Sequence, residues 1–126
     1  MVPSVTKALD EVRAAFPGAE VSVREEPDGG AVVLVDPVDP GELYVQRETW
    51  IGFRITFQYP YSDVYPHFVR GDLTRVDGAA LGEGMSSATF EDRPAIQISR
   101  RSNHLNPATD TAVIKLHKVL RWLCSR

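Results

Sequence analysis

The segment from Thr49 to Tyr59 constrains the fold more than any other part of the chain. Apolar side chains recur at every second position, and polar side chains stand between several of them. The alternating apolar residues are Ile51, Phe53, Ile55 and Phe57. This period of two predicts a β-strand with one buried face. We expect the strand to stop at Tyr59-Pro60, because proline cannot donate a backbone hydrogen bond to a neighbouring strand.

Shorter segments have the same strand-like character. Residues 20–26 alternate between apolar and polar side chains, and residues 31–35 form a continuous apolar, largely β-branched run. Residues 68–70 predict a brief strand, and residues 95–99 a further strand or an extended segment. Residues 71–92 carry four glycines and few apolar side chains, which predicts a long surface loop.

A helix is predicted near each end of the chain. In the first helix, Ser4 suits the N-cap and Pro17-Gly18 the end. In the second, Asn106 suits the N-cap and Pro107 the first helical position. Spacings of three and four define the two apolar stripes: Val5, Ala8, Leu9, Val12 and Phe16, then Ala112, Val113, Leu116, Val119, Leu120 and Leu123. The cations of the second helix are expected to point away from its stripe; they are Lys115, Lys118 and Arg121.

The predicted order is a helix, an antiparallel meander of four strands, a long loop and a helix, within one domain spanning residues 1–126. Helices placed at the ends of an antiparallel sheet define the α+β class. A chain of 126 residues, 43% of them apolar, has the length of one domain and can bury a core without disulfides or a structural metal.

Composition narrows the function. Lys and Arg number 14 and Asp and Glu 17, and this net charge of −3 gives no reason to expect nucleic-acid binding. No apolar run could span a membrane or serve as a signal segment, so we expect a cytoplasmic protein with no membrane partner. Cys124 is the one cysteine, which excludes an internal disulfide and fits a reducing compartment.

Few residues carry obvious chemistry, and we expect neither a metal nor a cofactor. Cys124 lies at a helix C-terminus, where the helix dipole disfavours a reactive thiolate. His67 is expected to be a structural hydrogen-bonding residue and His117 to flank the packed helix face. His104 lies in the polar run of residues 99–104, before a helix start, where loops often carry function. The alternative for this run is loop polarity combined with helix capping.

Two short motifs extend the interpretation. The sequence Phe57-Gln58-Tyr59-Pro60, with Pro66 further on, is similar to the Tyr-Pro loop of the ubiquitin-conjugating enzyme superfamily, although its spacing is stretched. Asn106-Pro107-Ala108 looks like the Ser-Pro-Ala start of that family's second helix. With the element order, the resemblance covers Ser4 to Leu123 and also includes the family's RWD-like binding domains. The short chain resembles divergent bacterial members, several of which are encoded beside ubiquitin-like proteins and activating enzymes in antiphage defence operons.

The departures from this family concern its chemistry. Counting back from Pro107, the position of the family's catalytic cysteine falls at Gln97, and a glutamine amide cannot form a thioester. The family's His-Pro-Asn motif is also missing, since the corresponding residues are Ser87-Ala88-Thr89-Phe90. The resemblance therefore implies a conjugating-enzyme fold without a catalytic cysteine.

Three functions remain as hypotheses. The first is a non-catalytic protein that binds a ubiquitin-like modifier, its activating enzyme or a conjugating partner. Its anchors would be Tyr61, Val64 and Tyr65, although some of these side chains could instead pack inward. The second is an atypical enzyme of that pathway that uses a nucleophile or positioning site at Ser99, His104 and Asn106. The third is a plain RWD-type interaction domain with no link to modifiers.

Overall fold

A computed structural model describes all 126 residues and contains two helices and six strands. The helices are α1 (Pro3–Ala15) and α2 (Ala112–Cys124). The strands are β1 (Glu20–Glu25), β2 (Ala31–Val38), β3 (Thr49–Ile55), β4 (His67–Arg70), β5 (Met85–Phe90) and β6 (Arg93–Ile98). The α+β class expected from the sequence is confirmed. Neither helix has the length and apolar character required to cross a membrane.

The sheet has more strands than the sequence predicts. All six strands are antiparallel, in the order β1-β2-β3-β4-β6-β5. The prediction of a four-stranded sheet was therefore wrong, as was the prediction that residues 71–92 are all surface loop. β5 lies inside that segment, but its sequence Met-Ser-Ser-Ala-Thr-Phe lacks regular apolar alternation. Its pairing with β6 over six residues, rather than burial of its own face, accounts for the strand.

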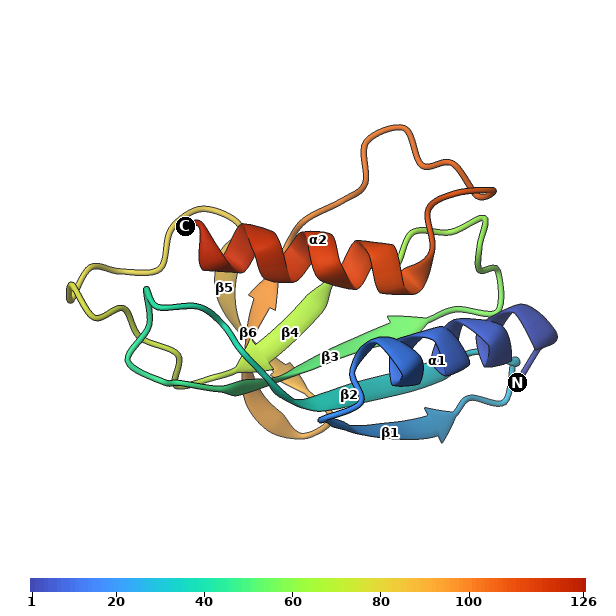
Figure 1. Ribbon diagram of the computed structural model, residues 1–126, viewed down its shortest axis with the longest axis horizontal. Coiled ribbons are helices and arrows are strands. Elements are labelled where there is room, and N and C mark those ends of the chain that lie inside the picture. The colour runs from blue at the N-terminus through green and yellow to red at the C-terminus, as the bar shows by residue number, and fades with distance from the viewer.

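Both helices lie on one face of the sheet, and the main core fills the space between the two layers (Figure 1). In β3, the alternate residues Ile51, Phe53 and Ile55 enter this core. The largest fully buried side chains include Tyr44, Phe53, Leu9, Ile51, Ile55, Ile98, Leu116 and Leu123. Each such apolar side chain contributes about 1.5–3 kcal/mol relative to an exposed one.

A smaller apolar cluster forms on the opposite face, where the β5–β6 hairpin folds back over the sheet. Phe90 lies against Gly52 of β3, and its ring stacks on Trp50 at 5.8 Å and on Phe68 at 4.9 Å between centroids. A Cβ at Gly52 would lie only 2.3 Å from the Phe90 ring. At the hairpin turn, Glu91 accepts hydrogen bonds from Arg24 of β1, the opposite edge strand. The sheet is therefore curled across this face.

The helix starts differ from the expected ones. α1 begins at Pro3, and its N-cap residue Val2 makes no side-chain cap, so Ser4 lies inside the helix. α2 begins at Ala112, where the Thr111 hydroxyl accepts a hydrogen bond from the Ile114 amide at 3.2 Å.

The residues expected to start the second helix form a separate turn. The backbone amide of Asp110 donates to the backbone carbonyl of Asn106 at 2.8 Å. The Asp110 carboxylate accepts a hydrogen bond from the backbone amide of Asn106 at the same distance. The Asn106 side chain accepts from the Ala108 amide. These local bonds close the turn before α2, so Asn106 and Pro107 do not begin the helix.

Candidate functional site

Two segments that the sequence analysis singled out meet at one end of the molecule. We call residues 56–66, between β3 and β4, the Tyr-Pro loop, and residues 99–111, between β6 and α2, the polar segment. In Figure 1 they are the green and orange loops on the right, near the N-terminus of α2. Side chains of both loops and of the two helices connect them.

Tyr59 anchors the Tyr-Pro loop to both helices. Its side chain is buried, and its phenolic oxygen accepts a hydrogen bond from the Ala112 amide at 3.0 Å. Its carbonyl oxygen accepts from the Ser4 hydroxyl of α1 at 2.9 Å. Burial raises the pKa of the Tyr59 phenol, which favours the neutral form. The loop therefore has a fixed position relative to α1 and α2.

Asp63 joins the Tyr-Pro loop to the polar segment and α2. Its carboxylate accepts hydrogen bonds from the Ser102 amide at 2.7 Å and the Ser102 hydroxyl at 2.9 Å. Lys115 of α2 forms an ion pair with it at 3.1 Å and donates to the Ser102 hydroxyl at 2.8 Å. Burial alone would raise the pKa of Asp63, but the bonds from Ser102 and Lys115 outweigh it and hold the pKa below its usual range.

Lys115 corrects the sequence analysis, which placed it away from the packed face. The residue is only 8% exposed and shares a helix face with the core residues Ala112, Leu116, Val119 and Leu123. A lysine at helical spacing within an apolar stripe needs a carboxylate partner, because a buried unpaired charge is costly. That spacing was a signal for the Asp63–Lys115 pair, although it did not identify Asp63.

The anchored Tyr-Pro loop exposes aromatic side chains. Tyr61 is 79% exposed and Phe57 49% exposed, while Val64 is buried in the core. Tyr65 is partly buried, with the Arg101 guanidinium 4.3 Å from its ring centroid. Of the three expected anchors, Tyr61 therefore has the most accessible side chain. Phe57 is an additional exposed aromatic that the alternating pattern had placed inside a strand, but β3 ends at Ile55.

The candidate catalytic residues do not form a catalytic arrangement. Gln97 lies in β6, opposite Phe68 and Ser86, and its amide donates to the Ser99 hydroxyl at 3.2 Å. His104 is exposed, with a left-handed φ of 56°, and its side chain makes no hydrogen bond. No general base therefore contacts Ser99.

Asn106 contributes to the turn before α2 and makes no contact with Ser99 or His104 that would complete a site. Cys124 lies at the C-terminal end of α2, and burial together with Asp39 raises the pKa of its thiol. A raised pKa lowers the thiolate fraction at neutral pH, so this cysteine is a poor nucleophile.

Two histidines belong to the packing. His117 stacks on Phe16 of the segment after α1, at 5.2 Å between ring centroids. His67 of β4 is fully buried beside Phe53, and neither ring nitrogen has a hydrogen-bond partner. The expectation that His67 is a structural hydrogen-bonding residue was wrong. Burial and the positive charge of Lys115 lower its pKa to about 3, so the ring is neutral at physiological pH.

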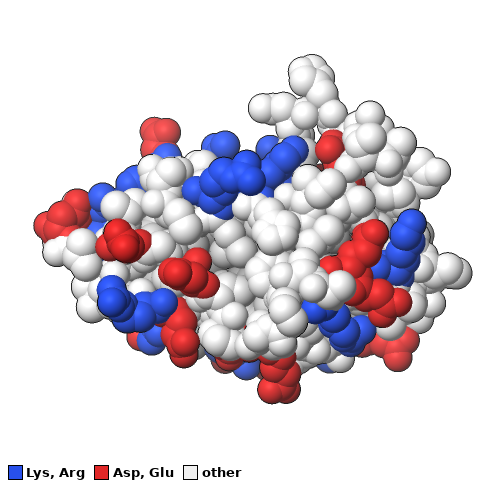
Figure 2. Space-filling model, in the orientation of Figure 1, with Lys and Arg blue, Asp and Glu red and all other residues white.

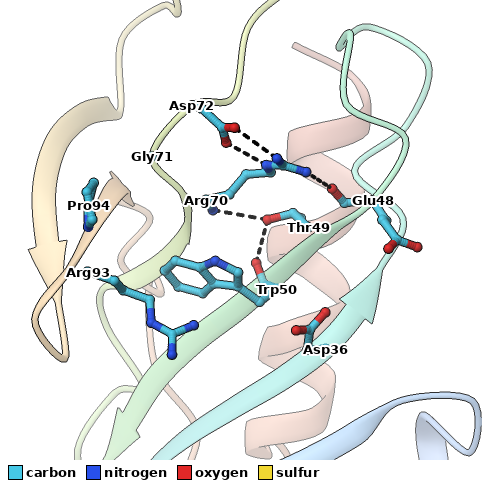
Figure 3. A pocket seen from close by; sticks show the side chains of 9 residues that line it. All are labelled: Asp36, Glu48, Thr49, Trp50, Arg70, Gly71, Asp72, Arg93 and Pro94. Atoms are coloured by element: carbon cyan, nitrogen blue, oxygen red, sulfur yellow. Dashed lines mark hydrogen bonds and ion pairs between the residues drawn. The ribbon is translucent and has the colours of Figure 1, made fainter.

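A shallow cleft of about 560 Å³ lies on the sheet face away from the helices (Figure 3). We call it the sheet-face cleft. Arg70 donates to the Asp72 carboxylate at 2.9 Å and to the Glu48 carbonyl at 3.0 Å. Arg93 lies over the Trp50 ring, 5.2 Å from its centroid. Three acids and two arginines line the cleft, and Arg70 and Asp72 form an ion pair, so the lining has no surplus of positive charge.

No group of three or more His, Cys, Asp or Glu side chains is arranged to hold a metal ion. No protein-family model, curated protein or solved structure matches the chain. The function is therefore inferred from the geometry of the site and from the motifs of the sequence.

Proposed function

We propose that this chain is a non-catalytic protein-binding domain, similar to ubiquitin-conjugating enzymes. In this proposal it binds a ubiquitin-like modifier, its activating enzyme or a conjugating partner in a bacterial conjugation pathway of the antiphage-defence kind. The observation that carries the binding role is the anchored Tyr-Pro loop, which presents Tyr61 and Phe57 to solvent.

The rigidity of this loop favours binding. Tyr59 ties it to both helices, and Asp63 ties it to Ser102 and Lys115. An exposed aromatic on a fixed backbone loses little conformational entropy when a partner covers it. Aromatic residues are also the side chains that most often dominate binding energy at interface centres.

The chemistry near the loop supports a binding role over catalysis. The position assigned to the family's cysteine is Gln97, a strand residue whose amide binds Ser99. The one thiol, at Cys124, lies at the far end of α2 from the loop and has a raised pKa. A thioester intermediate would need an activated thiolate, which neither residue provides, and an oxyester would need a general base at the Ser99 hydroxyl, where none makes contact.

The pathway assignment comes from the resemblance of the motifs and element order to the ubiquitin-conjugating enzyme superfamily. In support, a helix precedes strands that pair consecutively from β1 to β4, the Tyr-Pro loop lies between β3 and β4, and a second helix closes the chain. The β5–β6 hairpin departs from the expected four-stranded order.

The test is size-exclusion chromatography with light scattering, using the purified chain together with a bacterial ubiquitin-like protein and its activating enzyme. We expect a stable complex with one of them that Tyr61→Ala combined with Phe57→Ala weakens at least tenfold. Val76→Ala is the matched control, because Val76 is an exposed apolar residue between β4 and β5, outside the Tyr-Pro loop. No complex at tens of micromolar would reject the pathway assignment.

A second assay separates binding from catalysis. The same mixture with ATP, analysed on gels with and without thiol, should contain no covalent adduct of this chain. An adduct that Ser99→Ala removes would establish the atypical enzyme and contradict the non-catalytic proposal.

A further inference from the structure

A second cleft, separate from the exposed aromatics of the Tyr-Pro loop, lies between α2 and the start of the polar segment. It has a volume of about 270 Å³, and we call it the basic cleft. The residues that define it are Arg100, Arg101, Ser102, Lys115, Lys118 and Trp122. Figure 2 shows a group of blue side chains over α2, on a face where blue and red side chains otherwise lie interspersed.

The charge of this cleft is unbalanced. Four cations line it, and Asp110 is the one acid among the lining residues. Lys115 is neutralised from below by Asp63, but Arg100, Arg101 and Lys118 form no ion pair. The chain as a whole has a net charge of −3, so this positive cluster is not a consequence of overall composition. Like charges held together repel one another and lower the stability of the free protein.

The arginines are held in place by aromatic rings rather than by carboxylates. The guanidinium of Arg100 lies 5.0 Å from the Trp122 ring centroid, and that of Arg101 lies 4.3 Å from the Tyr65 centroid. Stacking fixes the plane of a guanidinium and leaves its N–H groups free to donate. Such N–H groups match a carboxylate in a bidentate geometry.

We propose that the basic cleft binds a carboxylate-rich segment of a partner protein, with Arg100, Arg101 and Lys118 as the recognition residues. A cleft of this volume is below the range typical of small-molecule sites and admits one or two side chains. Trp122 also lines the cleft, and Arg100 and Arg126 both lie over its ring. Nucleic acid fits less well, because phosphate-backbone binding requires a longer basic track and a favourable overall charge.

The inference does not depend on the modifier pathway, so synthetic peptides can test it. The probe is a fluorescein-labelled Gly-Glu-Glu-Glu-Glu-Gly peptide, and anisotropy measures its binding to the full chain at low salt. We expect micromolar affinity that falls several-fold between about 50 mM and about 300 mM salt. The corresponding glutamine peptide should not bind measurably.

Variants locate the binding. Arg100→Gln combined with Lys118→Gln should weaken binding at least tenfold. Arg93→Gln combined with Arg47→Gln is the matched control: it makes the same change in net charge at exposed arginines without ion pairs, outside this cleft, and should change the Kd less than twofold. An equal loss in the control would show that overall charge, not the cleft, attracts the peptide, and would overturn the proposal.

Trp122 gives a direct readout of occupancy. In a Trp50→Phe background it is the remaining tryptophan, so the peptide should change its fluorescence with the same Kd as the anisotropy. The absence of Glu-peptide binding would reject the proposal. Tenfold tighter binding of a phosphoserine peptide, or of an oligothymidylate of equal charge, would replace carboxylate with phosphate as the recognised group and would equally overturn it.

Discussion

The sheet-face cleft and the basic cleft are both lined by charged side chains beside a tryptophan, but they use these charges differently. In the sheet-face cleft, Arg70 binds Asp72, and Arg93, which forms no ion pair, belongs to a lining that has three acids and two arginines. In the basic cleft, Arg100 and Lys118 have no carboxylate partner. A charge paired within the chain is already neutralised, whereas unpaired charges of one sign remain available to bind a ligand.

The layers beneath the clefts differ as well. Under the sheet-face cleft, Phe90 fills the space above Gly52, so the hairpin itself covers that face. Under the basic cleft lies the Asp63–Lys115 pair, with His67 behind it. The contact beneath the sheet-face cleft is apolar, and the one beneath the basic cleft is an ion pair. The following variants distinguish the two.

The largest expected change in stability comes from breaking the ion pair beneath the basic cleft. Asp63→Ala should lower the free energy of unfolding by about 3 kcal/mol, because it leaves a largely buried ammonium at Lys115 without its anion. Urea unfolding measures the change. Asp72→Ala, the same deletion at the exposed Arg70 pair, should cost less than about 1 kcal/mol. Equal losses in the two variants would contradict the distinction between the clefts.

A substitution at Gly52 tests the apolar packing of Phe90 beneath the sheet-face cleft. Gly52→Ala places a methyl group within 2.3 Å of the Phe90 ring and should cost about 2 kcal/mol as the hairpin shifts. Gly18→Ala is the matched control, because nothing lies within 4 Å of a Cβ at Gly18. Thermal unfolding followed by circular dichroism measures both. A neutral Gly52→Ala would show that Phe90 does not pack tightly on β3.

Acid should weaken the region under the basic cleft through His67. Its pKa is about 3 in the folded chain and 6.5 in the reference state, so the unfolded chain binds a proton that the folded chain rejects between these values. Stability is therefore greatest above pH 6.5 and should fall by about 1 kcal/mol per pH unit on acidification toward pH 3.

The His67→Leu variant isolates this contribution. It removes the titrating ring and two unpartnered nitrogens, so it should unfold with a weaker pH dependence between pH 6.5 and 4 than the parent chain. Parallel pH profiles for the two proteins would mean that His67 becomes protonated without unfolding. Asp63 has a lowered pKa, so its own contribution should be lost only below about pH 4.

The smallest expected effects are the stability changes caused by removing one positive charge from each cleft, and the two changes should have opposite signs. Lys118→Gln should raise stability by about 0.3 kcal/mol, because it relieves repulsion in the basic cleft. Arg70→Gln should lower stability by up to about 1 kcal/mol, because it removes an ion pair. Precise urea midpoints at low salt measure both, and the difference should shrink at high salt. Effects of the same sign would contradict the contrast between the two clefts.

Several features could be predicted from the sequence because they depend on local patterns. The alternation around Ile51 and Phe53 and the stripe from Val5 to Val12 are properties of neighbouring residues. They predicted α1 and β3, although β3 ends at Ile55 rather than at Tyr59. The polar character of residues 99–104 was visible in the same way. The candidate residue Ser99 was identified, but its hydrogen bond to Gln97 follows from their positions at the end of β6.

Other features depend on which distant residues meet, and no local pattern contains that information. The strand identity of residues 85–90 comes from pairing with β6, and the burial of Lys115 depends on Asp63, 52 residues earlier in the chain. The exposure of Tyr61 and the burial of Val64 depend on how Tyr59 anchors their loop.

Hydrophobic periodicity acts within a single element, and it was therefore sufficient to predict the α+β class and the presence of the two terminal helices. Which charges are neutralised and which remain free depends on how the elements pack together. The ion pairs and cation–π contacts that settle this join residues from separate elements, as Asp63 and Lys115 do, and they exist only once the sheet and helices have packed together.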